Sequence, residues 1–155
     1  MFASIFCMIA AIRVGRVAIS LLVVCIILFV KELTDSQILL YYAANDPETM
    51  ASFAFWYVAF NITNVSAILG VYIAHRTIPV GFCLAARVFI YYCLLSSVII
   101  FARGIEQVYF LTEHLKTLYL SVRFLNYGFI FFLGYSLYQA YKRSKEFEER
   151  IAWNI

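Results

Sequence analysis

Two long apolar runs occupy the middle of the chain and are separated by one short polar break. The runs cover residues 51–74 and 79–102, and the break is His75-Arg76-Thr77-Ile78-Pro79. A helix needs about 20 apolar residues, at a rise of about 1.5 Å each, to cross a bilayer. Each run is long enough to cross, and the break has room only for a turn. The pattern therefore predicts a membrane-spanning helical hairpin.

Two further apolar segments flank this hairpin. The first covers residues 14–32, where Arg16 and Lys31 can extend toward the headgroups at its two ends. The last covers residues 118–141 and is rich in tyrosine and phenylalanine, which are typical of membrane interfaces. The sequence thus predicts an all-α membrane protein, a single-domain four-transmembrane-helix bundle with a tail over residues 142–155.

Composition supports a lipid environment for most of this chain. Of its 155 residues, 65% are hydrophobic and 14% are charged, whereas soluble domains contain about 25% charged residues. The formal net charge of +3 is too small and too scattered to indicate nucleic-acid binding. The bilayer is therefore the first expected partner, and four spans leave no room for a soluble catalytic domain.

The segments outside the predicted spans differ in charge and in expected structure. Residues 1–12 either continue the first span as a helix or lie along the inner membrane surface. Residues 31–50 and 103–116 form two loops on the opposite side, and a short helix is expected after Thr34-Asp35-Ser36-Gln37, a capping-box pattern. The two loops carry six acidic residues: Glu32, Asp35, Asp46, Glu48, Glu106 and Glu113.

Basic residues favour one side of the membrane. Only Lys31, Arg103 and Lys116 lie in the two acidic loops. Seven others precede the first span, join the second to the third, or follow the fourth: Arg13, Arg16, Arg76, Lys142, Arg143, Lys145 and Arg150. Because Lys and Arg are retained on the cytoplasmic side, we expect both termini to be cytoplasmic and both acidic loops to face outward or into a lumen.

Several polar side chains fall inside the predicted spans. Asn61 and Asn64 are expected to make hydrogen bonds between helices. Arg87, about 12 Å from the Pro79 turn by helical rise, either extends to the inner headgroups or forms an anion or lipid-headgroup site. Arg123 lies near the outer interface, where Glu106 or Glu113 can pair with it. Asn126 is a further polar residue of the last span.

Small residues recur at every fourth position in the second span, at Ser66, Gly70 and Ala74. Such a ridge lets another helix approach closely. It seats either a neighbour within the bundle or a second copy of the protein.

No arrangement of residues in the sequence supports catalysis, a bound metal or a cofactor, so we expect a non-enzymatic protein. Cys7 and Cys83 lie near the inner interface, where they are either palmitoylated or simply buried. The C-terminal Trp153 and Ile155 match the hydrophobic-x-hydrophobic ending that some cytoplasmic PDZ scaffolds bind by strand addition. Alternatively, Trp153 docks on the headgroups.

The layout resembles the small invertebrate septate-junction tetraspans of the pasiflora type in size, inside termini, two short outer loops and spans that fill most of the chain. Claudins have a Trp and a Cys pair in the first outer loop, and tetraspanins have Cys-Cys-Gly in a large second one. Both loops here lack these motifs. The resemblance includes no motif, so it assigns no functional residue. It implies a scaffold of occluding junctions that supports a paracellular barrier.

We therefore expect a structural or assembly component of a membrane complex, associating laterally with other membrane proteins or with itself. Lateral junctions of the plasma membrane are the leading location. One alternative is a trafficking adaptor or accessory subunit of endosomal or lysosomal membranes. The other is a small pore or transporter lined by Asn61, Asn64, Arg87 and Asn126.

Overall fold

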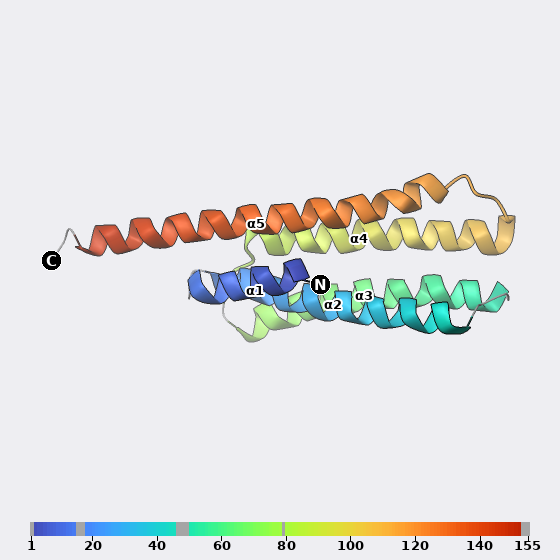
Figure 1. Ribbon diagram of the computed structural model, residues 1–155, viewed down its shortest axis with the longest axis horizontal. Coiled ribbons are helices and arrows are strands. Elements are labelled where there is room, and N and C mark those ends of the chain that lie inside the picture. Colours follow the sequence, from blue (N-terminus) through green and yellow to red (C-terminus); the bar gives the residue numbers. More distant parts are fainter. Residues whose placement is uncertain (1, 15–17, 46–49, 79, 153–155) are drawn as a thin grey trace.

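The computed structural model describes residues 2–14, 18–45, 50–78 and 80–152, and these residues are almost entirely helical (Figure 1). In chain order the elements are α1 (Phe2–Val14), α2 (Ile19–Asn45), α3 (Met50–Thr77), α4 (Leu84–Ile105), the short π-helix η2 (Glu106–Phe110) and α5 (Lys116–Ala152). No strand occurs within these ranges. The expected all-α class is confirmed.

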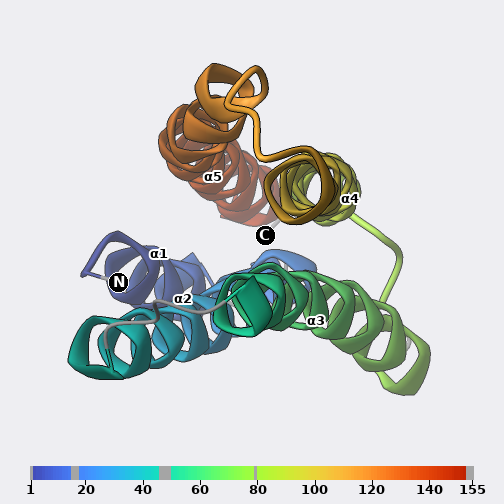
Figure 2. The ribbon, with the colours of Figure 1, turned by 90° about the vertical axis from the view of Figure 1, so that its right-hand side faces the viewer.

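The helices form two layers, seen end-on in Figure 2. Helices α4 and α5 lie side by side in one layer, and α1, α2 and α3 make up the other. Extended residues 80–83 lead from the α1–α2–α3 layer into α4. Because α2 to α5 all run along the same long axis, each end of the bundle contains segments from both layers.

Three helices are long and apolar enough to cross a membrane: Ala54–Thr77, Leu84–Phe110 and Lys116–Glu146. They correspond to the second, third and fourth predicted spans, which supports a membrane protein. Helix α2 has 27 residues, so it extends for about 40 Å, as far as α3. Its apolar run ends at Val30, and Lys31, Glu32 and Asp35 follow within the same helix. The first predicted span, residues 14–32, and the side on which each terminus lies remain predictions.

The first outer loop was predicted wrongly, because α2 continues without a break through residues 31–45. The hydroxyl groups of Thr34 and Ser36 donate to the carbonyl oxygens of Val30 and Glu32, one turn earlier in the same helix. Thr34 therefore caps no new helix. The charged residues that suggested a loop lie in the middle of a long helix.

Helix α1 also differs from both expectations for residues 1–12. It neither continues the first span nor lies apart from the bundle, because it folds back antiparallel to α2 (Figure 1). Ser4 Oγ donates a hydrogen bond of 2.6 Å to Glu32 Oε2, halfway along α2. Figure 2 shows α1 between α2 and α5, and its Cys7 and Ala11 are buried there. Residues 2–14 thus form a separate helix that packs against α2.

The half of the bundle that contains the α3–α4 connection has a core of buried apolar side chains. Its fully buried side chains come from α2, α3, α4 and α5 and include Val24, Leu28, Val71, Phe89 and Leu133. The rings of Phe89 and Phe129 lie 5.3 Å apart and join α4 to α5. This packing fills the interior of this half of the bundle.

Gly104→Ala is expected to destabilise the contact between α3 and α4 by about 1–3 kcal/mol. A Cβ atom at Gly104 would lie 3.0 Å from Cβ and Cγ of Tyr57, so the Tyr57 side chain would have to move by a few tenths of an ångström. Gly128→Ala is the matched control, because its added Cβ meets nothing within 4 Å. Unfolding in detergent micelles should separate the two variants, and equal midpoints would contradict the close approach at Gly104.

Candidate functional site

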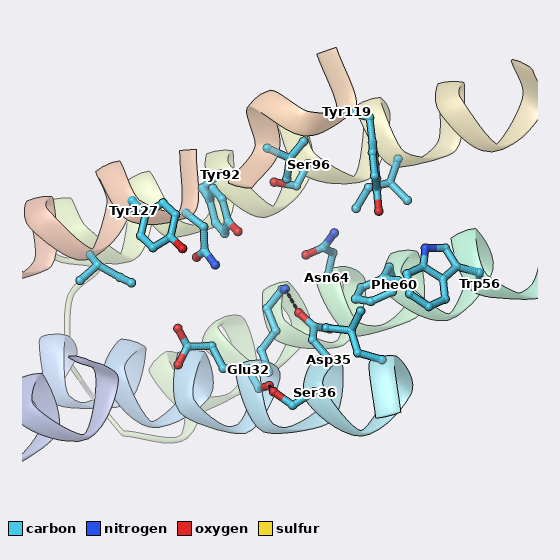
Figure 3. A pocket seen from close by; sticks show the side chains of 16 residues that line it. Glu32, Asp35, Ser36, Trp56, Phe60, Asn64, Tyr92, Ser96, Tyr119 and Tyr127 are labelled. Atoms are coloured by element: carbon cyan, nitrogen blue, oxygen red, sulfur yellow. Dashed lines mark hydrogen bonds and ion pairs between the residues drawn. The ribbon is translucent and has the colours of Figure 1, made fainter. Parts of the chain in front are cut away.

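A cavity of about 390 Å³ lies between the two layers, near the midpoints of α2 and α3 (Figure 3). Its lining comes from α2, α3, α4 and α5. The polar members are Lys31, Glu32, Asp35, Ser36, Asn64, Tyr92, Ser96, Tyr119, Asn126 and Tyr127. Since α3, α4 and α5 are the three helices apolar enough to span a membrane, this polar lining faces the interior of a membrane bundle.

An ion pair forms the floor of the cavity. Lys31 Nζ lies 2.5 Å from Asp35 Oδ2, one helical turn away, and both side chains are largely buried. The second carboxylate oxygen, Asp35 Oδ1, accepts a hydrogen bond of 2.7 Å from Thr63 Oγ1 of α3. Thr63 lies near the middle of the α3 span Ala54–Thr77. Charge at this depth is costly unless it is paired, and in membrane proteins it usually marks function.

Asn64 is a deeply buried polar residue of the cavity wall, with an exposed fraction of 1%. Its Oδ1 atom has no hydrogen-bond partner among the described residues, and the side chain points into the cavity (Figure 3). Asn126 of α5 lines the same space. A buried acceptor without a partner costs about 1–3 kcal/mol, and a bound solute or water would remove that cost.

Asn61 lies on a different side of α3. Its Nδ2 donates 2.9 Å to the carbonyl oxygen of Tyr57 in the same helix, and its side chain lines an apolar groove between α3 and α4. Asn61 Nδ2 thus bonds within its own helix, and Asn64 Oδ1 has no partner among the described residues. Neither atom forms the predicted hydrogen bond between helices.

Aromatic side chains cover much of the remaining cavity wall. Trp56 and Phe60 of α3 have ring centroids 5.1 Å apart. Tyr92 of α4 and Tyr119 and Tyr127 of α5 complete the set. Ring faces carry partial negative charge and attract cations. The cavity thus combines acidic, amide and aromatic groups, with one lysine held by Asp35.

At the end of the bundle where α4 meets η2, a second ion pair holds the chain reversal before α5. Arg103 Nη1 lies 2.5 Å from Glu106 Oε2 and donates 2.9 Å to the carbonyl oxygen of Thr112. Glu106 also accepts hydrogen bonds from Thr112 Oγ1 and from the backbone N–H of Leu115. Arg103 and Glu106 are 5% and 6% exposed. The pair closes the short turn that contains Leu111 at φ 53°.

This arrangement bears on two expectations, of which the pairing of Arg123 stays a prediction and the length of the second outer loop is corrected. Glu106 pairs with Arg103, whereas the side chain of Arg123 lies outside the described part of the structure. The helical segment continues to Phe110, so the second outer loop is shorter than residues 103–116. In that loop the exposed Glu113 accepts a hydrogen bond of 2.9 Å from Lys116 Nζ, which lowers the pKa of its carboxyl group.

Arg103→Ala should lower the unfolding midpoint clearly, because it removes the partner of a buried carboxylate and frees the Thr112 carbonyl. Lys116→Ala is the control, since its ion pair with Glu113 is exposed and should contribute little. Thermal unfolding in detergent compares the two. Equal shifts would mean that the Arg103 pair does not hold this end of the bundle.

Contacts of the buried His75 join three segments at the opposite end of the bundle, where α3 ends. His75 Nδ1 lies 2.8 Å from the Val71 carbonyl oxygen, and Nε2 lies 2.6 Å from Ser20 Oγ of α2. Ser20 Oγ also accepts from the backbone N–H of Cys83, and the ring stacks on Phe82 at 4.4 Å. Three segments meet at this one buried side chain. Sequence reasoning missed it, because a single histidine in a turn has no distinguishing spacing.

Arg87 lies elsewhere than expected. Helix α4 begins only at Leu84, so Arg87 is in its first turn and exposed. The expected depth of about 12 Å assumed a helix beginning at Pro79, whereas the helix begins at Leu84. Of the four residues proposed to line a pore, the structure brings together Asn64 and Asn126, whereas Asn61 and Arg87 lie outside the cavity.

The predicted small-residue ridge of α3 faces α2 at Gly70, where an added Cβ would meet Ile27 Cδ1 at 3.6 Å. The neighbour at this position is therefore within the bundle, whereas Ser66 and Ala74 are more open.

The two candidate cysteines occupy structural positions. Cys7 is buried in the core. Cys83 Sγ accepts from the backbone N–H of Ala86 and caps α4. Both placements favour the simple structural interpretation over palmitoylation. Trp153 and Ile155 lie outside the described residues. Within those residues, no group of three His, Cys, Asp or Glu side chains could hold a metal ion.

Comparison of the chain with protein-family models, curated proteins and solved structures found no match.

Proposed function

We propose that this protein is a multi-pass membrane protein that binds a small polar solute in the cavity between its helices, in the manner of a small transporter. The cavity with its Lys31–Asp35 pair carries this proposal. On insertion scales, each charged residue at the centre of a membrane helix costs about 2.5–3.5 kcal/mol. Charges retained beside a cavity at that depth typically belong to a solute or ion pathway.

The position of the packed core favours a gated site over an open pore. Leu28, Phe89 and Leu133 close the bundle between the cavity and the α3–α4 connection. The cavity lies on the other side of this core, toward the end where α2 finishes and α5 begins. By the distribution of basic residues, that end is the outer one. We therefore expect solute to enter from outside and passage inward to require a rearrangement.

Reaction with a water-soluble thiol reagent tests access to the cavity. In a background with the four native cysteines replaced by alanine, Asn126→Cys should react from outside with the membrane-impermeant methanethiosulfonate ethyltrimethylammonium. Phe131→Cys is the matched control on the same helix. Phe131 is 81% exposed but does not line the cavity, so its thiol should face lipid, remain protonated and not react.

Reaction at Asn126→Cys that is much faster than at Phe131→Cys would support a water-accessible cavity. Equal rates, or no reaction at Asn126→Cys from either side of the membrane, would refute the proposed solute site. Labelling only from the inner side would retain the site but reverse the inferred sidedness.

Lateral assembly, including the junctional role that the layout suggests, is the second candidate. A groove of about 380 Å³ runs along the seam between α2 and α3, and its lining includes Ser66, Ala67 and Gly70. Small residues of this kind allow another membrane helix to approach closely. This groove supports association with other membrane proteins or with a second copy.

A tag inserted after Glu113, in the exposed turn before α5, tests this candidate by imaging. Staining of intact polarised epithelium at lateral borders would support a junctional assembly role. Staining that requires permeabilised cells and marks vesicles would favour the adaptor alternative in endosomal or lysosomal membranes.

Deletion of residues 153–155 tests the PDZ interaction, because undisturbed placement of the protein in its membrane would reject that interaction.

A further inference from the structure

The cavity already holds an ammonium group of the protein itself. Lys31 is the one cationic side chain among the described lining residues, and its Nζ lies 2.5 Å from Asp35 Oδ2. Asp35 thus holds one ammonium group in this space. Lys31 is held by that carboxylate, and Asn64 Oδ1 on the opposite wall receives no hydrogen bond from it.

That opposite wall presents an acceptor. Asn64 Oδ1 is buried, points into the cavity and has no hydrogen-bond partner among the described residues. An unsatisfied amide oxygen requires a donor, so a purely apolar molecule or a ligand that carries acceptors alone would leave it unpaired. A ligand with an N–H group would satisfy Asn64 directly.

The aromatic side chains of the wall add selectivity for positive charge. Trp56, Phe60, Tyr92, Tyr119 and Tyr127 all line the cavity. A cation over a ring face is attracted more strongly once it is desolvated, and the same rings pack against an apolar ligand body. A volume of about 390 Å³ lies in the lower part of the range of small-molecule sites. Bare metal ions fit less well, since no cluster of three metal-ligating side chains occurs in the described ranges.

We infer that the cavity selects a small organic ammonium ion that carries at least one N–H and an apolar or aromatic body. The N–H donates to Asn64 Oδ1, the body packs on the rings of Trp56 and Phe60, and the positive charge faces Tyr92 and the acidic floor. This inference rests on the proposed solute site, because the ligand has to reach the cavity. The same ammonium chemistry could come from a dissolved amine or from the headgroup of phosphatidylethanolamine.

Trp56 provides a direct reporter of binding. The chain has two tryptophans, so Trp153→Phe leaves Trp56 as the single one. In nanodiscs of phosphatidylcholine, 2-phenylethylammonium should change its fluorescence saturably, whereas the neutral 2-phenylethanol and the anionic phenylacetate should bind at least tenfold more weakly. Adding phosphatidylethanolamine to the nanodiscs distinguishes the sources, because loss of apparent amine affinity would assign the site to the lipid headgroup.

Asn64→Leu should weaken amine binding about tenfold or more. Asn61→Leu is the matched control, because Asn61 is one turn earlier on α3 but lines another groove, and its affinity should be unchanged. Equal binding of amine and neutral analogue to the Trp153→Phe protein would overturn the inference without any variant. If Asn126→Cys reacts from outside but no amine binds, the solute site stands and the ligand class is wrong. If Asn126→Cys does not react, the proposed function itself fails.

Discussion

Asp35→Leu should destabilise the protein by about 3–5 kcal/mol, the largest effect expected of any single replacement in the cavity. The variant leaves the Lys31 ammonium without the carboxylate that lies 2.5 Å from it, and leaves the Thr63 hydroxyl without its acceptor in α2. A buried charge that loses its partner costs about this much. Unfolding by a graded series of SDS concentrations in mixed micelles measures the loss.

Combining Asp35→Leu with Lys31→Met tests whether the lost stability comes from the unpaired Lys31 charge or from the change of residue at position 35. Replacing both members of a buried ion pair with apolar residues is often neutral or stabilising, so the double variant should recover most of the lost stability. Lys142→Ala supplies the surface comparison, because its contact with Glu146 is exposed and 3.9 Å long. If Asp35→Leu behaved like Lys142→Ala, the charged turn of α2 would be at the membrane surface and the cavity would be wrongly placed.

Phe89→Ala is expected to cost about 3 kcal/mol. Phe89 is fully buried between α4 and α5, 5.3 Å from the ring of Phe129, and its removal leaves a void in the packed core. Large-to-small changes of this kind cost about 3–5 kcal/mol. The lower end applies here, because lipid is as apolar as the core and only the packing is lost.

Phe101→Ala is the control on the same helix, since Phe101 is 62% exposed and should face lipid. Its midpoint in the same SDS titration should change by less than about 1 kcal/mol. A larger loss for Phe101→Ala than for Phe89→Ala would mean that α4 presents its opposite face to the bundle. Repeating the Asn126→Cys reaction in the Phe89→Ala variant tests whether loss of this ring opens the inner end of the bundle.

The class of the protein and the three longest spans followed from the sequence because apolar run length alone decides them. The hydrophobic runs around residues 51–74, 79–102 and 118–141 each exceed what a bilayer crossing needs. The first apolar segment was misjudged for a physical reason. Lys31, Glu32 and Asp35 were interpreted as the end of a span because charges are rare inside lipid, but the structure retains them in the helix by pairing them with Asp35, Ser4 and Thr63.

Part of the candidate site was recognisable in the sequence. Asn64 and Asn126 were proposed as polar residues of the spans, and both line the cavity. Lys31 and Asp35 were missed although their i,i+4 spacing is that of a helical ion pair, and Arg103 and Glu106 show the related i,i+3 spacing. These spacings could have indicated continuous helices. By contrast, which residues face the same cavity depends on how four helices pack, and no local pattern carries that information.

Disulfide trapping between α2 and α3 is the most direct test that the charged half of α2 lies inside the bundle. In the background without native cysteines, Asp35→Cys combined with Thr63→Cys should crosslink rapidly on oxidation in membranes, because these side chains lie within hydrogen-bond distance. Leu111→Cys, in the exposed turn before α5, supplies the standard for a thiol in an outer loop. A high yield of the Asp35–Thr63 crosslink is the expected result. No crosslink, together with aqueous labelling of Asp35→Cys as fast as that of Leu111→Cys, would place residues 31–45 in an outer loop and contradict the cavity.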